Sequence, residues 1–172
     1  MKEQKYIIEW DGPFDTDSLK DAYEDSDYKG YSKAWTLYAL TDRHPLYGSD
    51  ALIYIGKTTE QGVLMRLTQH EKKWWEGQAY LGAIFPIELW DNWSEKKPDD
   101  AIVHNASVSR IEELLIYSLA PAYNSRNKNN AKKSSNLRVL NLGQFHSIPS
   151  EISGFYNIEK VPEPETIDKK KP

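Results

Sequence analysis

Two apolar, aromatic runs of strand length lie close together in the first third of the chain, and they constrain the fold more than any other feature. Residues 34–41 (AWTLYALT) and 51–57 (ALIYIGK) are rich in β-branched and aromatic residues, which favour strands. Residues 42–50 between them carry Asp, Pro, Gly and Ser, the composition of a loop. The two runs therefore predict an antiparallel hairpin with a long tip.

The sequence after the hairpin predicts a helix, a strand and a second helix. Apolar residues at helical spacing predict helices over 62–78 and 105–119, and Pro121 ends the second one. Residues 83–90 are typical of a strand, and Pro86 predicts an edge position or a bulge for it. We therefore expect an α+β fold with a small, mostly antiparallel three-stranded central sheet, flanked by helices and elaborated at both ends.

Composition divides the chain into four segments. They are an acidic N-terminal extension (1–33), a folded core (34–126), a basic loop with a C-terminal elaboration (127–160) and a tail (161–172). Short strands are expected in the two extensions, at 6–10 and 137–142. The tail has too little apolar content to fold, so we expect it to be disordered.

Several classes of protein are excluded by composition. The chain has no Cys, which excludes disulfides, thiolate metal sites, Fe–S clusters and a cysteine nucleophile. No stretch approaches the roughly 18 consecutive apolar residues that a membrane helix needs. The first segment, MKEQKYIIEWDGPFD, lacks the apolar stretch of a signal peptide. We therefore expect a cytoplasmic protein that does not enter a membrane.

Charge is unevenly distributed along the chain. The net charge is −4, yet residues 1–30 carry four Lys against nine Asp and Glu, whereas residues 124–138 carry five basic side chains and no acidic one. These five basic residues are Arg126, Lys128, Lys132, Lys133 and Arg138. In an otherwise acidic chain this run favours a surface that contacts the DNA backbone, and a solvated loop is the alternative.

A second basic cluster, Lys72-Lys73-Trp74-Trp75, also contains two aromatic rings. It can present cations to phosphates and a Trp to an exposed base. In the alternative interpretation one Trp belongs to the core and the lysines form a solvated face.

Polar and glycine-containing motifs follow one another in a definite order between residues 36 and 124. The five motifs are Thr36-Leu37-Tyr38, Tyr54-Ile55-Gly56-Lys57, Arg66 with His70, the Glu112-Glu113-Leu114-Leu115-Ile116 segment, and Pro121-Ala122-Tyr123-Asn124. In this order and spacing the sequence resembles the GIY-YIG nuclease superfamily over residues 34–126. Thr36 and Leu37 depart from the pattern, because the family has Gly and then Ile or Val at these places.

The resemblance implies a divalent-metal-dependent endonuclease that hydrolyses DNA phosphodiester bonds at a one-metal site. Glu112 would hold Mg²⁺ or Mn²⁺, and the enzyme would act as a monomer or homodimer. It would be of restriction type, or a structure-selective nuclease of phage or mobile-element origin. The alternative is a catalytically weak nucleic-acid-binding or inhibitory module on the same fold.

The residue types themselves fit phosphodiester hydrolysis. A carboxylate is a hard ligand for Mg²⁺, and Glu112 and Glu113 point about 100° apart on a helix, so one of them is the better ligand. Arg66 can bind a phosphate bidentately, and Lys57 supplies a second cation. Gly56 allows the backbone to approach a substrate closely.

The general base is left open by the sequence. Holding a tyrosine deprotonated at neutral pH costs roughly 4 kcal/mol, because its ordinary pKa is near 10. The resemblance implies that Tyr38 is the base or orients the water, with His70 as its proton partner and Tyr54 as hydrogen-bonding support. Asn124 would brace the metal site or simply form a turn.

Overall fold

The computed structural model describes residues 2–24, 33–58, 62–71, 73–102, 104–126 and 134–155. The α+β class is as expected, but the expected three-stranded sheet is wrong, because the sheet has six strands in the order β3-β2-β4-β1-β5-β6. The strands are β1 (Gln4–Phe14), β2 (Trp35–His44), β3 (Gly48–Lys57), β4 (Gln78–Pro86), β5 (Leu137–Gly143) and β6 (Glu151–Ser153). The helices are α1 (Thr16–Glu24), α3 (Val63–Glu71), α4 (Asn105–Leu119) and the 3₁₀ segments η2 (Ile87–Glu95) and η3 (Pro98–Asp100).

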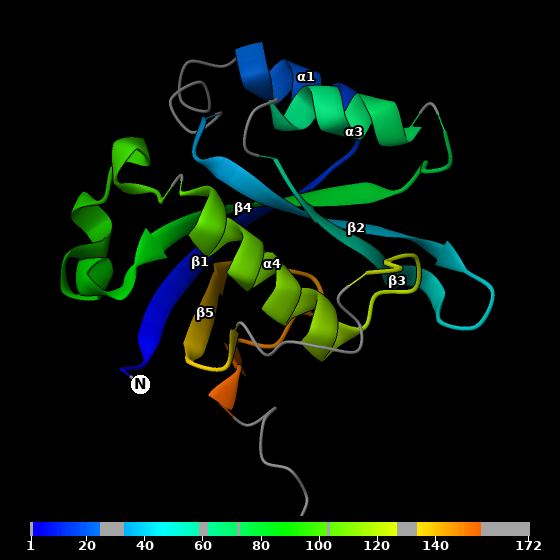
Figure 1. The fold of residues 1–172 in the computed structure, drawn as a ribbon. Coiled ribbons are helices and arrows are strands. Elements are labelled where there is room, and N and C mark those ends of the chain that lie inside the picture. The colour runs from blue at the N-terminus through cyan, green and yellow to red at the C-terminus, as the bar shows by residue number, and fades with distance from the viewer. Residues whose placement is uncertain are drawn as a thin grey trace, which may run out of the picture.

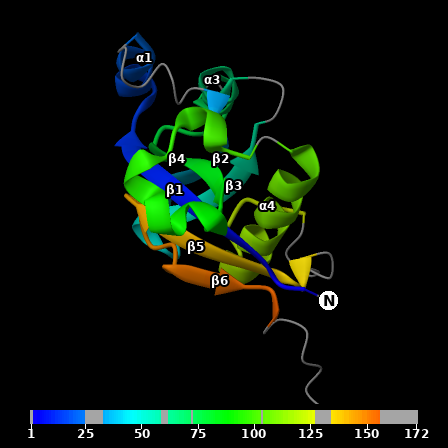
Figure 2. The ribbon, with the colours of Figure 1, turned by 90° about the vertical axis from the view of Figure 1, so that its left-hand side faces the viewer.

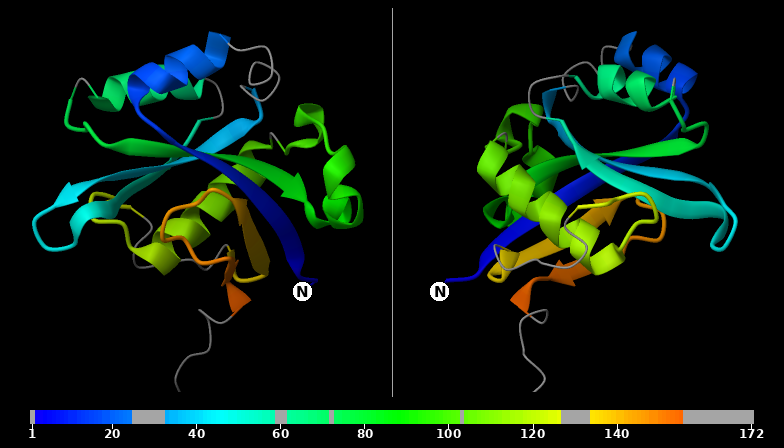
Figure 3. Two further views of the ribbon diagram at one scale, coloured as in Figure 1. Left: turned by 180° about the vertical axis from the view of Figure 1, so that it is seen from behind. Right: turned by 45° about the vertical axis from the view of Figure 1, so that its right-hand side comes forward.

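The N-terminal strand is the reason for the larger sheet. β1 lies between β4, to which it is antiparallel, and β5, to which it is parallel. β5 and β6 then extend the sheet beyond β1 (Figure 2). All other neighbouring strands are antiparallel, so the sheet is mixed, and it curls into a half-barrel (Figure 3). Strands were expected at 6–10 and 137–142, but pairing between segments so far apart in the chain leaves no periodic signal, so their place in the central sheet was not predicted. β6 was not expected at all.

The predicted hairpin exists, with a shorter tip than expected. β2 and β3 pair as far as His44 and Gly48, so only residues 45–47 form the turn. β4 is an interior strand between β2 and β1, which contradicts the edge position predicted from its proline. Pro86 is tolerated because it is the last residue of the strand, directly before η2.

The two main helices differ in how well the sequence predicts them. α4 matches the expected bounds, and it ends at Ala120 in the left-handed conformation before Pro121. α3 is shorter than the predicted helix over 62–78. The chain turns after it, because the carbonyl oxygen of His70 accepts hydrogen bonds from the N–H groups of Lys73 and Trp74 at 2.9 and 3.0 Å.

Helices cover both faces of the sheet (Figure 1). Successive residues of a strand point to opposite faces, so β2 contributes to two cores. Leu37 packs in the core on the α4 side with Ile111, whereas Tyr38 packs in the core on the α3 side with Leu67. This alternation directs the Tyr38 side chain toward α3, which carries Arg66 and His70.

Thr36 on β2 carries a buried hydroxyl. The residue is buried, and its Oγ1 has no hydrogen-bond partner among the residues that the structure describes. Valine has the same shape without the hydroxyl and favours strands equally. We expect Thr36→Val to raise the free energy of unfolding by about 1 kcal/mol, measured by urea denaturation. Thr41→Val is the matched control, because the Thr41 hydroxyl donates to the carbonyl oxygen of Gln78 at 3.4 Å. A lower urea midpoint for Thr36→Val would show that the Thr36 hydroxyl does make a stabilising contact.

Candidate active site

Two adjoining cavities lie along β3, which is one of the two edge strands of the sheet. The first has a volume of about 510 Å³, and the second about 580 Å³. Both are lined by Tyr54 and Tyr123, so they adjoin, and the two together are called the cleft. The first cavity contains most of the charged groups, namely Lys57, Glu112, Glu113 and Arg126, and the second is lined by Tyr54, His70, Trp74 and Tyr123.

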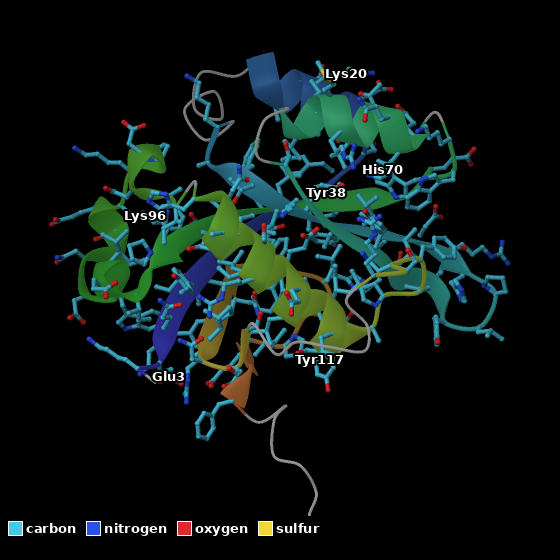
Figure 4. All side chains as sticks on the ribbon, in the orientation of Figure 1. Glu3, Lys20, Tyr38, His70, Lys96 and Tyr117 are labelled. Carbon is cyan, nitrogen blue, oxygen red and sulfur yellow. The ribbon has the colours of Figure 1, made fainter. Side chains whose placement is uncertain are left out.

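Tyr38 and His70 are joined by a direct hydrogen bond. The Tyr38 hydroxyl lies 3.0 Å from Nε2 of His70, and the two labelled side chains lie close together in Figure 4. Arg66 also hydrogen-bonds to the Tyr38 hydroxyl. The Tyr38 ring is 1 % exposed and stacks on Tyr54, with ring centroids 6.1 Å apart. Four of the five predicted catalytic residues are therefore brought together in one contact network.

The surroundings of this network fix the protonation of two groups. Burial, and secondarily the neighbouring Tyr54, raises the pKa of Tyr38 well above its ordinary value, and the opposing effect of Arg66 is smaller. Burial lowers the pKa of His70, with further lowering by the positive charges of Arg66 and Lys73. At neutral pH the pair is thus a phenol and a neutral imidazole, and the hydroxyl donates to Nε2.

Gly56 makes room for the tyrosine. It is the register partner of Tyr38 on β3, and a Cβ atom built on it would lie 2.4 Å from the Tyr38 hydroxyl oxygen and 2.8 Å from a ring carbon of Tyr54. A glycine at this position predicts a close approach of the backbone to substrate. In the structure the space beside Gly56 is filled by the two tyrosine rings, so the glycine positions them.

Glu112 faces the same cleft from α4. Its carboxylate is 16 % exposed and lies 3.6 Å from Nζ of Lys57, which also donates a hydrogen bond to the Ser109 hydroxyl. Burial raises the pKa of Glu112, while Lys57 and, more weakly, Arg66 lower it. Sequence reasoning missed Ser109, although its position three residues before Glu112 puts both on one helix face.

Metal ions in proteins are bound by groups of carboxylate, imidazole and thiolate side chains. Within the described parts of the chain, no three His, Asp or Glu side chains gather in a group that could hold a metal. Mg²⁺ needs no such group, because it is usually bound through one or two carboxylates, several waters and substrate phosphates. A single carboxylate at an open cleft fits that requirement, and Glu112 would be the residue that holds the ion.

Asn124 holds the edge of β3. Its Oδ1 accepts a hydrogen bond from the N–H of Ile55 at 2.9 Å, and its Nδ2 donates to the Ile55 carbonyl at 2.8 Å. The N–H of Tyr123 donates to the carbonyl of Ile53 at 2.8 Å. The segment after α4 therefore pairs with the free side of β3 and fixes the backbone directly before Gly56.

The predicted DNA-contacting residues divide into three groups. Arg126 lines the first cavity, and Lys73 is exposed next to Trp74. Arg138 forms ion pairs with Glu3 at 2.8 Å and Glu151 at 3.0 Å. The remaining three, Lys128, Lys132 and Lys133, lie outside the described residues.

The structure also distinguishes the two tryptophans of the second basic cluster. Trp75 is buried, and its Nε1 donates to the Thr41 carbonyl at 3.2 Å. Trp74 is 39 % exposed and lies over the second cavity.

Comparison of the chain with protein-family models, with curated proteins and with solved structures found no match. The GIY-YIG assignment therefore stays a prediction that is based on the motifs and their geometry. Within the described residues, no helix is long and apolar enough to cross a membrane.

Proposed function

We propose that this protein is a divalent-metal-dependent endonuclease that hydrolyses DNA phosphodiester bonds at a GIY-YIG-type one-metal site. The observation that carries the proposal is the Tyr38 hydroxyl, which hydrogen-bonds to both His70 and Arg66. His70 lines the second cavity, and Glu112 lines the adjoining first cavity. The charge of Glu112 also acts on Arg66, so Glu112 and the Tyr38–His70–Arg66 network share one electrostatic environment.

In this proposal each side chain has a distinct task. Arg66 and Lys57 bind oxygens of the scissile phosphate and neutralise the charge that grows in the transition state. A water molecule attacks phosphorus, and its proton passes to His70, either directly or through the Tyr38 hydroxyl. The bond from phosphorus to the leaving sugar oxygen breaks, and that oxygen takes a proton from solvent. Tyr54 holds the Tyr38 ring in place by stacking.

Glu112 would hold a Mg²⁺ or Mn²⁺ ion, which when bound supplies positive charge to the phosphate and lowers the pKa of water. The carboxylate suits this task because partial burial leaves it few competing contacts, apart from Lys57 at 3.6 Å.

The decisive experiment is incubation of supercoiled plasmid with the protein and Mg²⁺ or Mn²⁺, with and without a chelator. We expect relaxed or linear DNA only when the metal is free. Tyr38→Phe keeps the buried ring and removes the hydroxyl, so it serves as the inactive control. A wild-type protein that shifts plasmid in a gel but never cleaves it would favour the alternative, a nucleic-acid-binding or inhibitory module on this fold.

Cleavage should depend on pH through His70. Only the neutral imidazole can accept a proton, and burial puts the pKa of His70 below its ordinary value of 6.5. As the pH falls, kcat/KM should therefore decline with a midpoint below pH 6.5. His70→Gln should lower the rate and remove this acidic decline. A decline centred at or above pH 6.5 would contradict the role assigned to His70.

A further inference from the structure

The second cavity contains two aromatic side chains that the proposed chemistry does not use. Tyr54 and His70 already belong to the catalytic network, but Trp74 and Tyr123 complete the lining and contribute no reacting group. Both are large and open to solvent, with exposed fractions of 39 % and 49 %. Exposed aromatic rings beside a cavity of about 580 Å³ are typical of a binding surface, not of a core.

The rings around this cavity meet edge to face. Trp74 contacts His70, Tyr54 and Tyr123 with centroid distances of 5.1, 5.8 and 5.7 Å and interplanar angles of 75°, 63° and 79°. These rings are therefore not stacked face to face on Trp74. The contacts also hold Trp74 in one place, so a flat ligand meets a preorganised aromatic wall.

Cationic side chains lie near the aromatic wall, together with the carboxylates of Glu112 and Glu113 in the first cavity. Lys57 and Arg126 line the adjoining first cavity, and Lys73 is exposed directly before Trp74. These cations and rings suit a ligand that combines a flat, aromatic group with an anionic group next to it. A nucleotide in a DNA strand has this chemistry, with its phosphate at the cationic groups and its base against the rings.

We propose that the Trp74–Tyr123 cavity binds an unpaired nucleobase next to the scissile phosphate. A base in a duplex is stacked and paired on both sides, so it cannot enter the cavity without leaving the helix. The preferred substrate is therefore DNA with single-stranded nucleotides at the point of cleavage. The position of the scissile phosphate rests on the proposed nuclease function, whereas binding of the base requires neither metal nor cleavage.

The test is a binding measurement in chelator, in which nothing is cleaved. Fluorescence anisotropy compares a labelled thymidine oligonucleotide with an abasic strand of equal length and charge. The wild-type protein should bind the strand with bases more tightly. Trp74→Ala and Tyr123→Ala should each weaken that binding by about 5- to 150-fold, the range for one stacked base, and leave binding of the abasic strand unchanged.

Two further variants serve as controls. Trp74→Phe keeps an aromatic face and should retain most of the affinity. Trp90→Ala removes an exposed Trp of η2 that lines neither cavity, so its affinity should equal that of the wild type. If the wild-type protein binds the thymidine oligonucleotide and the abasic strand with equal affinity, the proposal is overturned, whatever the variants show. Equal weakening of both strands by Trp74→Ala would also overturn it.

The outcome is separable from that of the plasmid experiment. If the protein cleaves plasmid but binds the two strands equally, the nuclease proposal is supported and the base-binding proposal is contradicted. If the protein binds bases through Trp74 but cleaves no DNA, the base-binding proposal is supported and the nuclease proposal is contradicted.

Discussion

Glu112→Gln should abolish plasmid cleavage in Mg²⁺ while leaving DNA binding intact. The substitution removes the anionic oxygen that would hold the metal and preserves the size of the side chain. Since a bound metal supplies several kcal/mol of transition-state stabilisation, we expect the cleavage rate to fall by at least ~10³-fold. DNA affinity in chelator should stay the same or rise, because the cleft loses a negative charge beside Lys57.

The neighbouring residue provides a matched control for this experiment. Glu113 lines the same cavity and carries the same charge, but it projects from α4 about 100° away from Glu112. Glu113→Gln should therefore retain most of the activity. Equal loss of cleavage in the two variants would show that the choice between the two carboxylates is wrong. Urea denaturation of both variants checks that any lost activity reflects lost chemistry and not lost folding.

Arg66→Lys should lower the single-turnover cleavage rate by at least ~10²-fold, the scale of one lost transition-state donor. Lysine keeps the positive charge, but it cannot bind a phosphate through two parallel N–H groups. The change also disturbs the proton path, because Arg66 hydrogen-bonds to the same Tyr38 hydroxyl that contacts His70. Because Arg66 would both bind the phosphate and hydrogen-bond to Tyr38, a lysine that only supplies positive charge should not replace it.

Arg43→Lys is a suitable control for Arg66→Lys. Arg43 is an exposed residue of β2 that lines neither cavity, so the conservative change should leave the rate unaltered. Near-normal cleavage by Arg66→Lys would show that the guanidinium group makes no bidentate contact in the transition state.

Local patterns in the sequence predicted local structure well. The helix over 105–119 was predicted to the residue, because an apolar stripe defines its length and Pro121 closes it. The hairpin was predicted from its two aromatic runs. The central position of β1 in the sheet was not predicted. The strand segments that pair with it lie at residues 79–86 and 137–143, and only the tertiary fold brings them next to β1.

The candidate site shows the same division. The i, i+4 spacing of Arg66 and His70 was enough to place them on one face of a helix. Tyr38 reaches them only because its side chain lies on the face of the sheet that α3 covers. The packing of α3 on the sheet decides this, and the local sequence does not show it. Likewise, α3 ends at Glu71, so helical periodicity could not show that Trp74 is exposed and Trp75 is buried.

The position of β1 also has a consequence for how the molecule is made. β1 pairs with β5, whose residues are synthesised 133 residues later, as the register of Gln4 with Leu137 shows. Its contacts are therefore highly non-local, which slows folding. Until β5 emerges, the nascent chain exposes one unpaired side of β1, an apolar strand edge of the kind that promotes aggregation. Since the candidate catalytic residues all lie before β5, the candidate site would be synthesised in full before the sheet that supports it can form completely.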